Sequence, residues 1–310
     1  MLSRLLRRLL LSQILGGAVL GWVIARQTGG SPWLVVVAGM GFPFLIILLL
    51  TLKTAVQSRA SGAHALWWRS LAGEYWAEIQ VFLFQLPWAK RPPVMLPAIG
   101  DAGLVPVVLV HGYLCNHRVW DAMATQLRRA GHPVLAVDLE PLFTSIDEYA
   151  ALIEQAVAQL CRQTGTEKVA LIGHSMGGLV IRVWMRRYGI QRAARVITLG
   201  TPHAGTQITF PIKTVNGTQM GWHSVWLQKL AASESASTRR LMRIALTPQD
   251  NIVYPQREQV LDGAQVTVFE GRGHLQLVLD SAVIAWVLQQ LEDPGSSVVG
   301  VVPHNTTTGV

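Results

Sequence analysis

Cysteine is scarce in this sequence, and its few residues form no recognisable motif. The 310 residues include only Cys115 and Cys161, which excludes a framework of several disulfides. No Cys/His spacing of the kind used by metal sites occurs, and no internal repeat is visible. We therefore interpret both cysteines as thiols that are buried or have no function. Two cysteines do not indicate whether the protein resides in an oxidising or a reducing compartment.

Acidic residues are scarce at the N-terminal end of the chain. Residues 1–91 hold nine Lys/Arg against two acids, Glu74 and Glu78, whereas residues 92–310 hold seventeen against sixteen. Most of the net charge of +8 therefore accompanies the apolar N-terminal region. Positive charge beside apolar segments is a membrane-topology signal, so we expect the bilayer, and no nucleic acid, as a partner.

Two long apolar stretches occupy the start of the chain. Residues 9–25 contain no charge, and residues 33–52 are uncharged over a length that spans a bilayer. We predict a transmembrane hairpin over residues 1–56, although a signal peptide is the alternative for the first stretch. Three arginines precede the first stretch and one lies in the turn, which predicts a multi-pass protein of the inner membrane with the rest of the chain in the cytoplasm.

The remaining chain divides into three predicted parts. Residues 57–92 are rich in tryptophan and other aromatics and predict a linker helix, which lies at the membrane interface or packs on the next domain. Residues 93–293 alternate between strand and helix patterns, which predicts a doubly wound, mostly parallel α/β sheet. Residues 294–310 are rich in Gly, Ser and Thr and predict a disordered tail.

Strand and helix patterns alternate regularly from residue 105 onwards. A serine at position 145, with Glu148 three residues on, predicts the start of a helix by a capping box. A last helix is expected near residues 275–291. The expected strands cover residues 105–110, 134–138, 169–172, 196–199, 243–246 and 265–269.

One strand ends in a turn that is typical of a nucleophile. The sequence VALIGHSMGGLVIRVW gives a β-branched run, then Ser175 in a G-x-S-x-G frame, then an apolar helical pattern. Such a turn holds a serine hydroxyl above the carboxyl end of a sheet. The frame alone also fits an ordinary glycine-rich turn, but both flanks here favour a nucleophile.

A serine hydroxyl needs a base, and the base needs an orienting acid. Downstream of Ser175, His274 follows a predicted strand and precedes the last helix, which predicts that it is the base. Asp250 is the acid that lies in a loop just after a predicted strand, and Asp262 reads as a turn residue. Two N–H groups should bind the oxyanion, those of Met176 at the helix start and Tyr113 after the first strand.

The segments VVLVHGY, GHSMGG, LGTPHAGT and DNIV…GRGH together resemble the α/β-hydrolase fold, and in particular bacterial triacylglycerol lipases and esterases. The match covers about residues 104–291. The resemblance implies Ser175 as nucleophile, Asp250 and His274 as its partners, and no cofactor. The region between positions 206 and 243 is short for a large lid, and a membrane hairpin is unusual for a secreted lipase.

These patterns predict a membrane-anchored serine hydrolase that cleaves carboxylic esters of lipids or other apolar acyl compounds. Trp222 and Trp226 line the acyl pocket in this hypothesis, or else pack in the core. An acyltransferase or thioesterase with the same triad, and a non-catalytic membrane scaffold, are the alternatives. Because every motif lies beyond residue 105, we also expect a protein lacking residues 1–56 to hydrolyse soluble esters. The sequence leaves the oligomeric state open.

Overall fold

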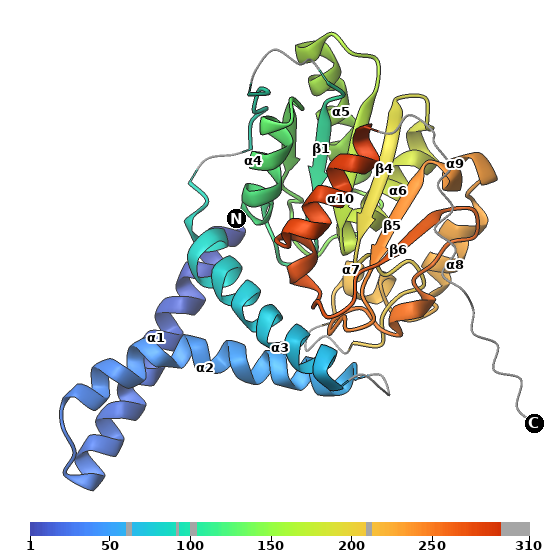
Figure 1. Ribbon diagram of the computed structural model, residues 1–310. Coiled ribbons are helices and arrows are strands. Elements are labelled where there is room, and N and C mark those ends of the chain that lie inside the picture. Colours follow the sequence, from blue (N-terminus) through green and yellow to red (C-terminus); the bar gives the residue numbers. More distant parts are fainter. Residues whose placement is uncertain (60–63, 91–92, 100–103, 209–212, 293–310) are drawn as a thin grey trace, which may run out of the picture.

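A six-stranded sheet forms the centre of the protein in the computed structural model (Figure 1). Its strand order is β2-β1-β3-β4-β5-β6, and all neighbouring pairs are parallel. The predicted parallel α/β sheet is therefore confirmed. The strands are β1 (Val107–Val110), β2 (Val134–Val137), β3 (Val169–His174), β4 (Ala193–Leu199), β5 (Met242–Leu246) and β6 (Gln265–Val268). The structure describes residues 1–59, 64–90, 93–99, 104–208 and 213–292, and the predicted tail 294–310 lies outside them.

Helices cover both faces of this sheet, which explains why the central strands read as continuous apolar runs. Alternate residues of β1 point to opposite faces. Val108 and Val110 belong to the apolar cluster that contains α5 and α6, and Val107 and Leu109 belong to the cluster that contains α4 and α10. These helices are α4 (Asp121–Arg129), α5 (Ala150–Thr164), α6 (Met176–Tyr188) and α10 (Ser281–Glu292).

Shorter helices lie in the loops that connect these elements. They are η3 (His117–Trp120), α7 (Val215–Gln219), α8 (Val225–Ala232), α9 (Ala236–Arg240), η4 (Gln256–Glu258) and η5 (Leu275–Val278). The expected helix over residues 275–291 is thus divided into the 3₁₀ turn η5 and the helix α10.

The predicted capping box at Ser145 is wrong. Helix α5 begins at Ala150, and the Ser145 hydroxyl donates to Asp147 Oδ2 over 3.1 Å instead of capping a helix. The side-chain amide of Gln219, from α7, donates to the same hydroxyl over 2.9 Å. A local pattern predicted a helix start, but a tertiary contact with α7 uses this serine.

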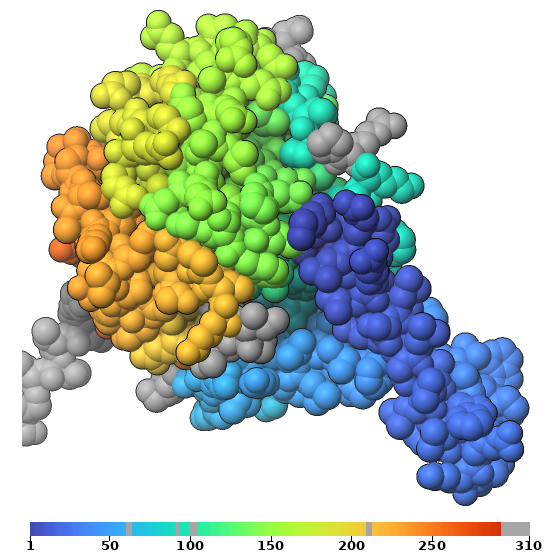
Figure 2. All heavy atoms as spheres, turned by 180° about the vertical axis from the view of Figure 1, so that it is seen from behind, coloured from blue at the N-terminus to red at the C-terminus, as the bar shows by residue number. Residues whose placement is uncertain are grey.

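The N-terminal region forms a helical hairpin of α1 (Leu2–Thr28) and α2 (Trp33–Gln57). By length and composition both helices could cross a membrane, although a signal sequence near an N-terminus passes the same test. Figures 1 and 2 show the turn of the hairpin projecting away from the sheet domain. Both ends nevertheless contact that domain. The Met1 amino group pairs with Glu140, and Leu2 is buried.

The aromatic-rich segment packs on the sheet domain, one of its two expected locations. It forms helix α3 (His64–Glu78), continues as the π-helix η1 (Ile79–Gln85) and ends in η2 (Leu86–Trp88). Val81 and Leu86 are fully buried against the cluster that contains α4 and α10. The segment also exposes four large aromatic side chains, namely Trp68, Trp76, Phe84 and Trp88.

Candidate active site

Ser175 lies in a strained turn between β3 and α6. Its backbone φ of 54° and ψ of −127° are unusual for a residue with a side chain. The glycines around it allow the turn to close, because a Cβ at Gly173 would lie 2.6 Å from the Gly178 nitrogen, and one at Gly177 would collide with the Val110 carbonyl oxygen. The turn therefore has the strand–elbow–helix geometry that the sequence predicted for a nucleophile.

His274 and Asp250 form a buried pair at the same edge of the sheet. Asp250 follows β5 and His274 follows β6, and His274 Nδ1 donates to Asp250 Oδ2 over 2.8 Å. The other oxygen of Asp250 accepts the backbone N–H groups of Ile252 and Val253 over 2.9 and 2.7 Å. The carboxylate is thereby fixed, and its bond to Nδ1 leaves the Nε2 atom of His274 available as a base.

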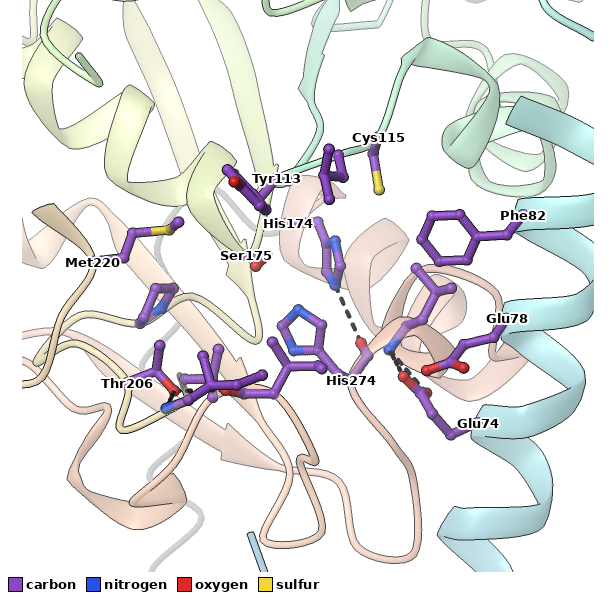
Figure 3. Close-up of a pocket in the computed structure, with 17 residues that line it drawn as sticks. Glu74, Glu78, Phe82, Tyr113, Cys115, His174, Ser175, Thr206, Met220 and His274 are labelled. Atoms are coloured by element: carbon purple, nitrogen blue, oxygen red, sulfur yellow. Dashed lines mark hydrogen bonds between the residues drawn. The ribbon is translucent and has the colours of Figure 1, made fainter. Parts of the chain in front are cut away.

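Ser175 and His274 both line one cavity of about 210 Å³ (Figure 3). Its wall is mostly apolar and includes Phe82 from η1 and Met220, which follows α7. Among the described residues that line it, three come from α3 and η1, namely Glu74, Glu78 and Phe82. The cavity is thus closed on one side by the aromatic-rich segment that precedes the sheet domain.

His111 shapes the loop that is predicted to supply one oxyanion donor. It is buried, its Nδ1 donates to the Gly112 carbonyl over 2.8 Å, and its Nε2 accepts the Leu139 N–H over 3.0 Å. Burial lowers the pKa of His111, which is consistent with this neutral tautomer. Because C=O and N–H of a trans peptide point in opposite directions, the first bond also fixes the direction of the Tyr113 N–H.

The second predicted donor, Met176, is the first residue of α6. The first N–H groups of a helix have no intrahelical acceptor, and the helix dipole there favours negative charge. Tyr113 lines the cavity beside Ser175, and Met176 follows Ser175 directly. The structure therefore brings both predicted donors to the nucleophile.

Two further titratable side chains face the cavity. His174 is buried, and its Nε2 donates to the His274 carbonyl over 3.1 Å. The pKa of His174 is lowered well below its usual value, mainly by burial and also by the positive charge that His274 can carry. His174 is therefore neutral and holds the backbone of His274. Burial raises the pKa of Cys115 to about 12, so its thiol is not a competing nucleophile at neutral pH.

Trp222 and Trp226, predicted to line the acyl pocket or to pack in the core, are absent from the described residues that line this cavity. Trp226 donates its Nε1 proton to Asp147 Oδ2 over 2.7 Å and packs against the apolar core that contains α5 and α6. Trp222 lies against the ring of His223, with centroids 4.1 Å apart. The apolar wall is formed by other residues, Met220 among them.

Glu74 and Glu78 are residues of the site that were not predicted from the sequence. The two oxygens of Glu74 accept the Leu275 N–H over 2.8 and 2.9 Å, and Oε2 also accepts the Gln276 N–H over 3.1 Å. Glu78 accepts from the Thr51 hydroxyl of α2 over 2.6 Å. A signal was present, because these are the only acids among the first 91 residues and lie one helical turn apart in an apolar segment.

Burial controls the ionisation of this pair. Burial raises the pKa of Glu78 from 4.5 to about 7, against the opposing effect of the Thr51 hydroxyl. It also raises the pKa of Glu74, with a further contribution from Glu78, while the N–H groups of Leu275 and Gln276 oppose the shift. The cavity that contains His274 is therefore lined by two carboxyl groups with raised pKa values, and their protonation affects its electrostatic potential. In the described part of the chain, no group of three or more His, Cys, Asp or Glu could hold a metal ion.

Known proteins resemble this chain over its sheet domain. Residues 105–239 match the family described as alpha/beta hydrolase fold. A triacylglycerol lipase of Burkholderia plantarii is 36% identical over 131 residues, which cover 39% of this chain and 36% of that protein. A triacylglycerol lipase of Pseudarthrobacter phenanthrenivorans is 36% identical over 111 residues, which cover 33% of this chain and 34% of that protein. The chain thus spans about a third of the length of these relatives.

A solved structure gives the same result for the fold. The mature form of the Bacillus licheniformis lipase BlEst2 superposes with a TM-score of 0.54 at 18% identity, covering 64% of this chain and 99% of that one. At this identity the likeness concerns the fold alone. The resemblance predicted from the four sequence motifs is confirmed.

Proposed function

From the premise that the chain has the α/β-hydrolase fold, we propose that it is a membrane-anchored serine hydrolase that cleaves carboxylic esters of lipids or other apolar acyl compounds. One observation carries this proposal. His274, bonded to Asp250 over 2.8 Å, and Ser175, held in a strained elbow, line the same cavity. The 36% identity to two triacylglycerol lipases supports the ester class.

In the proposed mechanism, the Ser175 hydroxyl oxygen attacks the ester carbonyl carbon and His274 Nε2 takes its proton. Asp250 stabilises the imidazolium that forms. The N–H groups of Tyr113 and Met176 bind the oxyanion, and each is worth on the order of 3 kcal/mol in the transition state. His274 then returns the proton to the leaving alcohol. Water, activated by the same imidazole, attacks the acyl-enzyme and releases the acid.

The shape of the cavity favours a small apolar acyl group. Its volume of about 210 Å³ lies below the roughly 300–1,000 Å³ that is usual for sites of drug-sized ligands. Leu114, Ile252 and Val253 add aliphatic wall next to Phe82 and Met220. We therefore expect short acyl chains to be hydrolysed faster than long ones.

The proposed anchor is the hairpin of α1 and α2. In the most apolar stretch of 18 residues, only 11% of α1 and 22% of α2 is buried inside the protein. Neither helix therefore serves as the core of the sheet domain. The four exposed aromatics of α3, η1 and η2 suit the membrane–water interface. In this proposal the hairpin, residues 1–56, crosses the bacterial inner membrane with its spans 9–25 and 33–52, and the catalytic domain, residues 93–293, lies in the cytoplasm.

Hydrolysis of p-nitrophenyl esters tests the proposed function. The full-length protein, purified in detergent, is assayed on esters from acetate to palmitate beside the Ser175→Ala variant. We expect turnover that is highest for short chains and a loss of at least about 10³-fold in the variant. Equal turnover by the folded variant would show that Ser175 is not the nucleophile.

A further inference from the structure

At the start of η5, three successive backbone N–H groups donate hydrogen bonds to side-chain oxygens. The His274 N–H donates to Asn251 Oδ1 over 3.2 Å. The Leu275 and Gln276 N–H groups donate to Glu74 over 2.8–3.1 Å. The first N–H groups of a helical turn need acceptors outside it, so these side chains fix where the turn begins.

Glu74 reaches this turn from α3, which lies about two hundred residues earlier in the chain. It is only 2% exposed, and its carboxyl group lies against the backbone of the loop that carries His274. A Cβ at Gly273 would approach the Glu74 Cβ to 2.6 Å, so glycine is required for this close contact. In Figure 3, dashed lines join the Glu74 carboxyl to the chain beside His274.

These contacts complete the immobilisation of His274. Its ring is bonded to Asp250, its carbonyl accepts from His174 Nε2 over 3.1 Å, and its own N–H is bonded to Asn251. Glu74 holds the two peptide groups that follow. A general base must be placed within a fraction of an ångström, because a shift of about 1 Å can cost 100-fold in rate.

The helix that carries Glu74 is itself tied to the N-terminal hairpin. Glu78, one turn further along α3, accepts from Thr51 of α2 over 2.6 Å. Thr54 of α2 accepts from the side-chain amide of Asn251 over 3.0 Å. The acceptors at the start of η5 are therefore positioned by α2 and α3, outside the sheet domain.

We propose that Glu74 is a positioning residue of the hydrolase, which holds the loop of the base His274 from a helix outside the α/β domain. The proposal rests on the proposed function. It makes α3 part of the active site, and it means that the sheet domain alone does not fix its own base.

The test compares Glu74→Ala and Glu74→Gln with a matched control, Glu154→Gln in α5, in full-length detergent-purified protein. kcat and KM are measured with p-nitrophenyl acetate, and Tm is measured in parallel. We expect Glu74→Ala to lower kcat on the order of 100-fold with KM within about twofold. Glu74→Gln, which keeps one acceptor oxygen and the shape, should lose less, on the order of tenfold. Glu154→Gln should stay within about twofold of wild type.

A second background separates positioning from general damage to the fold. If Glu74 acts through His274, adding Glu74→Gln to His274→Ala should not lower the residual activity further. An equal loss in both backgrounds, or wild-type kcat in folded Glu74 variants, would overturn the proposal. Absence of turnover by the wild-type protein would instead refute the proposed ester hydrolysis, so the two failures are distinguishable.

Discussion

The partly buried carboxyl of Glu78 should make the stability of this protein fall as the pH rises. Its pKa is about 7 in the folded protein against 4.5 for a free side chain, mainly because burial disfavours the charged form. Between these values the folded state holds a proton that the unfolded state has released. The contribution of Glu78 is therefore most favourable below pH 4.5 and is lost progressively as the pH rises through 7.

The size of the effect follows from the shift. A difference of about 2.5 pKa units, at 1.36 kcal/mol each, corresponds to on the order of 3 kcal/mol of unfolding free energy. Replacing the carboxyl by the uncharged amide in Glu78→Gln removes this titration. The fall in stability from pH 5 to pH 8 should then be smaller in the variant than in wild type, by several degrees in Tm.

Thermal unfolding of the detergent-solubilised full-length protein at pH 5, 6, 7 and 8 measures this difference. The matched substitution Glu154→Gln, in α5 and away from the cavity, serves as control and should keep the wild-type dependence on pH. If Glu78→Gln and wild type lost the same Tm over this range, Glu78 would not be the proton-binding group inferred from the structure.

Three further predictions concern the acid, the hairpin and the topology. Asp250→Asn should lower kcat by about 10⁴-fold, whereas Asp262→Asn should leave it nearly unchanged, and the reverse order would refute the assignment of the acid. Deleting residues 1–56 should lower kcat on soluble esters on the order of tenfold, because the deletion removes Thr54, which holds Asn251 beside the base. Full activity of the truncated protein would contradict this coupling. Alkaline phosphatase fused after Val310 should be inactive if the catalytic domain is cytoplasmic, and strong activity would contradict two spans.

The prediction for the truncated protein modifies what the sequence suggested, since hydrolysis is still expected but at a lower rate. All recognisable motifs lie beyond residue 105, and from the sequence the hairpin had no connection to them. The structure adds contacts that no motif encodes, since Thr51 and Thr54 meet Glu78 and Asn251 across the fold. Thr51 and Glu78 are 27 residues apart, and Thr54 and Asn251 are 197 apart, so both hydrogen bonds depend on tertiary packing, which local patterns do not report.

The sheet and the catalytic candidates were predictable because local chemistry determines them. β-branched runs bounded by polar turns located the strands to within a few residues, since parallel strands buried on both faces must be apolar throughout. The Ser175 elbow was visible because only glycines fit around it. The position of His274 after a strand singled it out, and the structure places it against Asp250.

Residues whose partners lie elsewhere in the fold were harder to interpret. Ser145 matched a capping box, yet its hydroxyl is used by Asp147 and by Gln219 of α7. Trp226 resembled a pocket residue but bonds to Asp147. In both cases the partner that determines the role of the residue is distant in the sequence, so the local pattern could not reveal it.

Covalent labelling of Ser175 tests the central claim most directly. The purified full-length protein is treated with a fluorophosphonate, digested, and the modified peptide is identified by mass spectrometry. We predict one phosphonyl adduct on Ser175, absent from the Ser175→Ala variant and formed far more slowly in His274→Ala, because the serine then lacks its base. An adduct on another residue, or no adduct on folded wild-type protein, would contradict the assignment of a serine hydrolase.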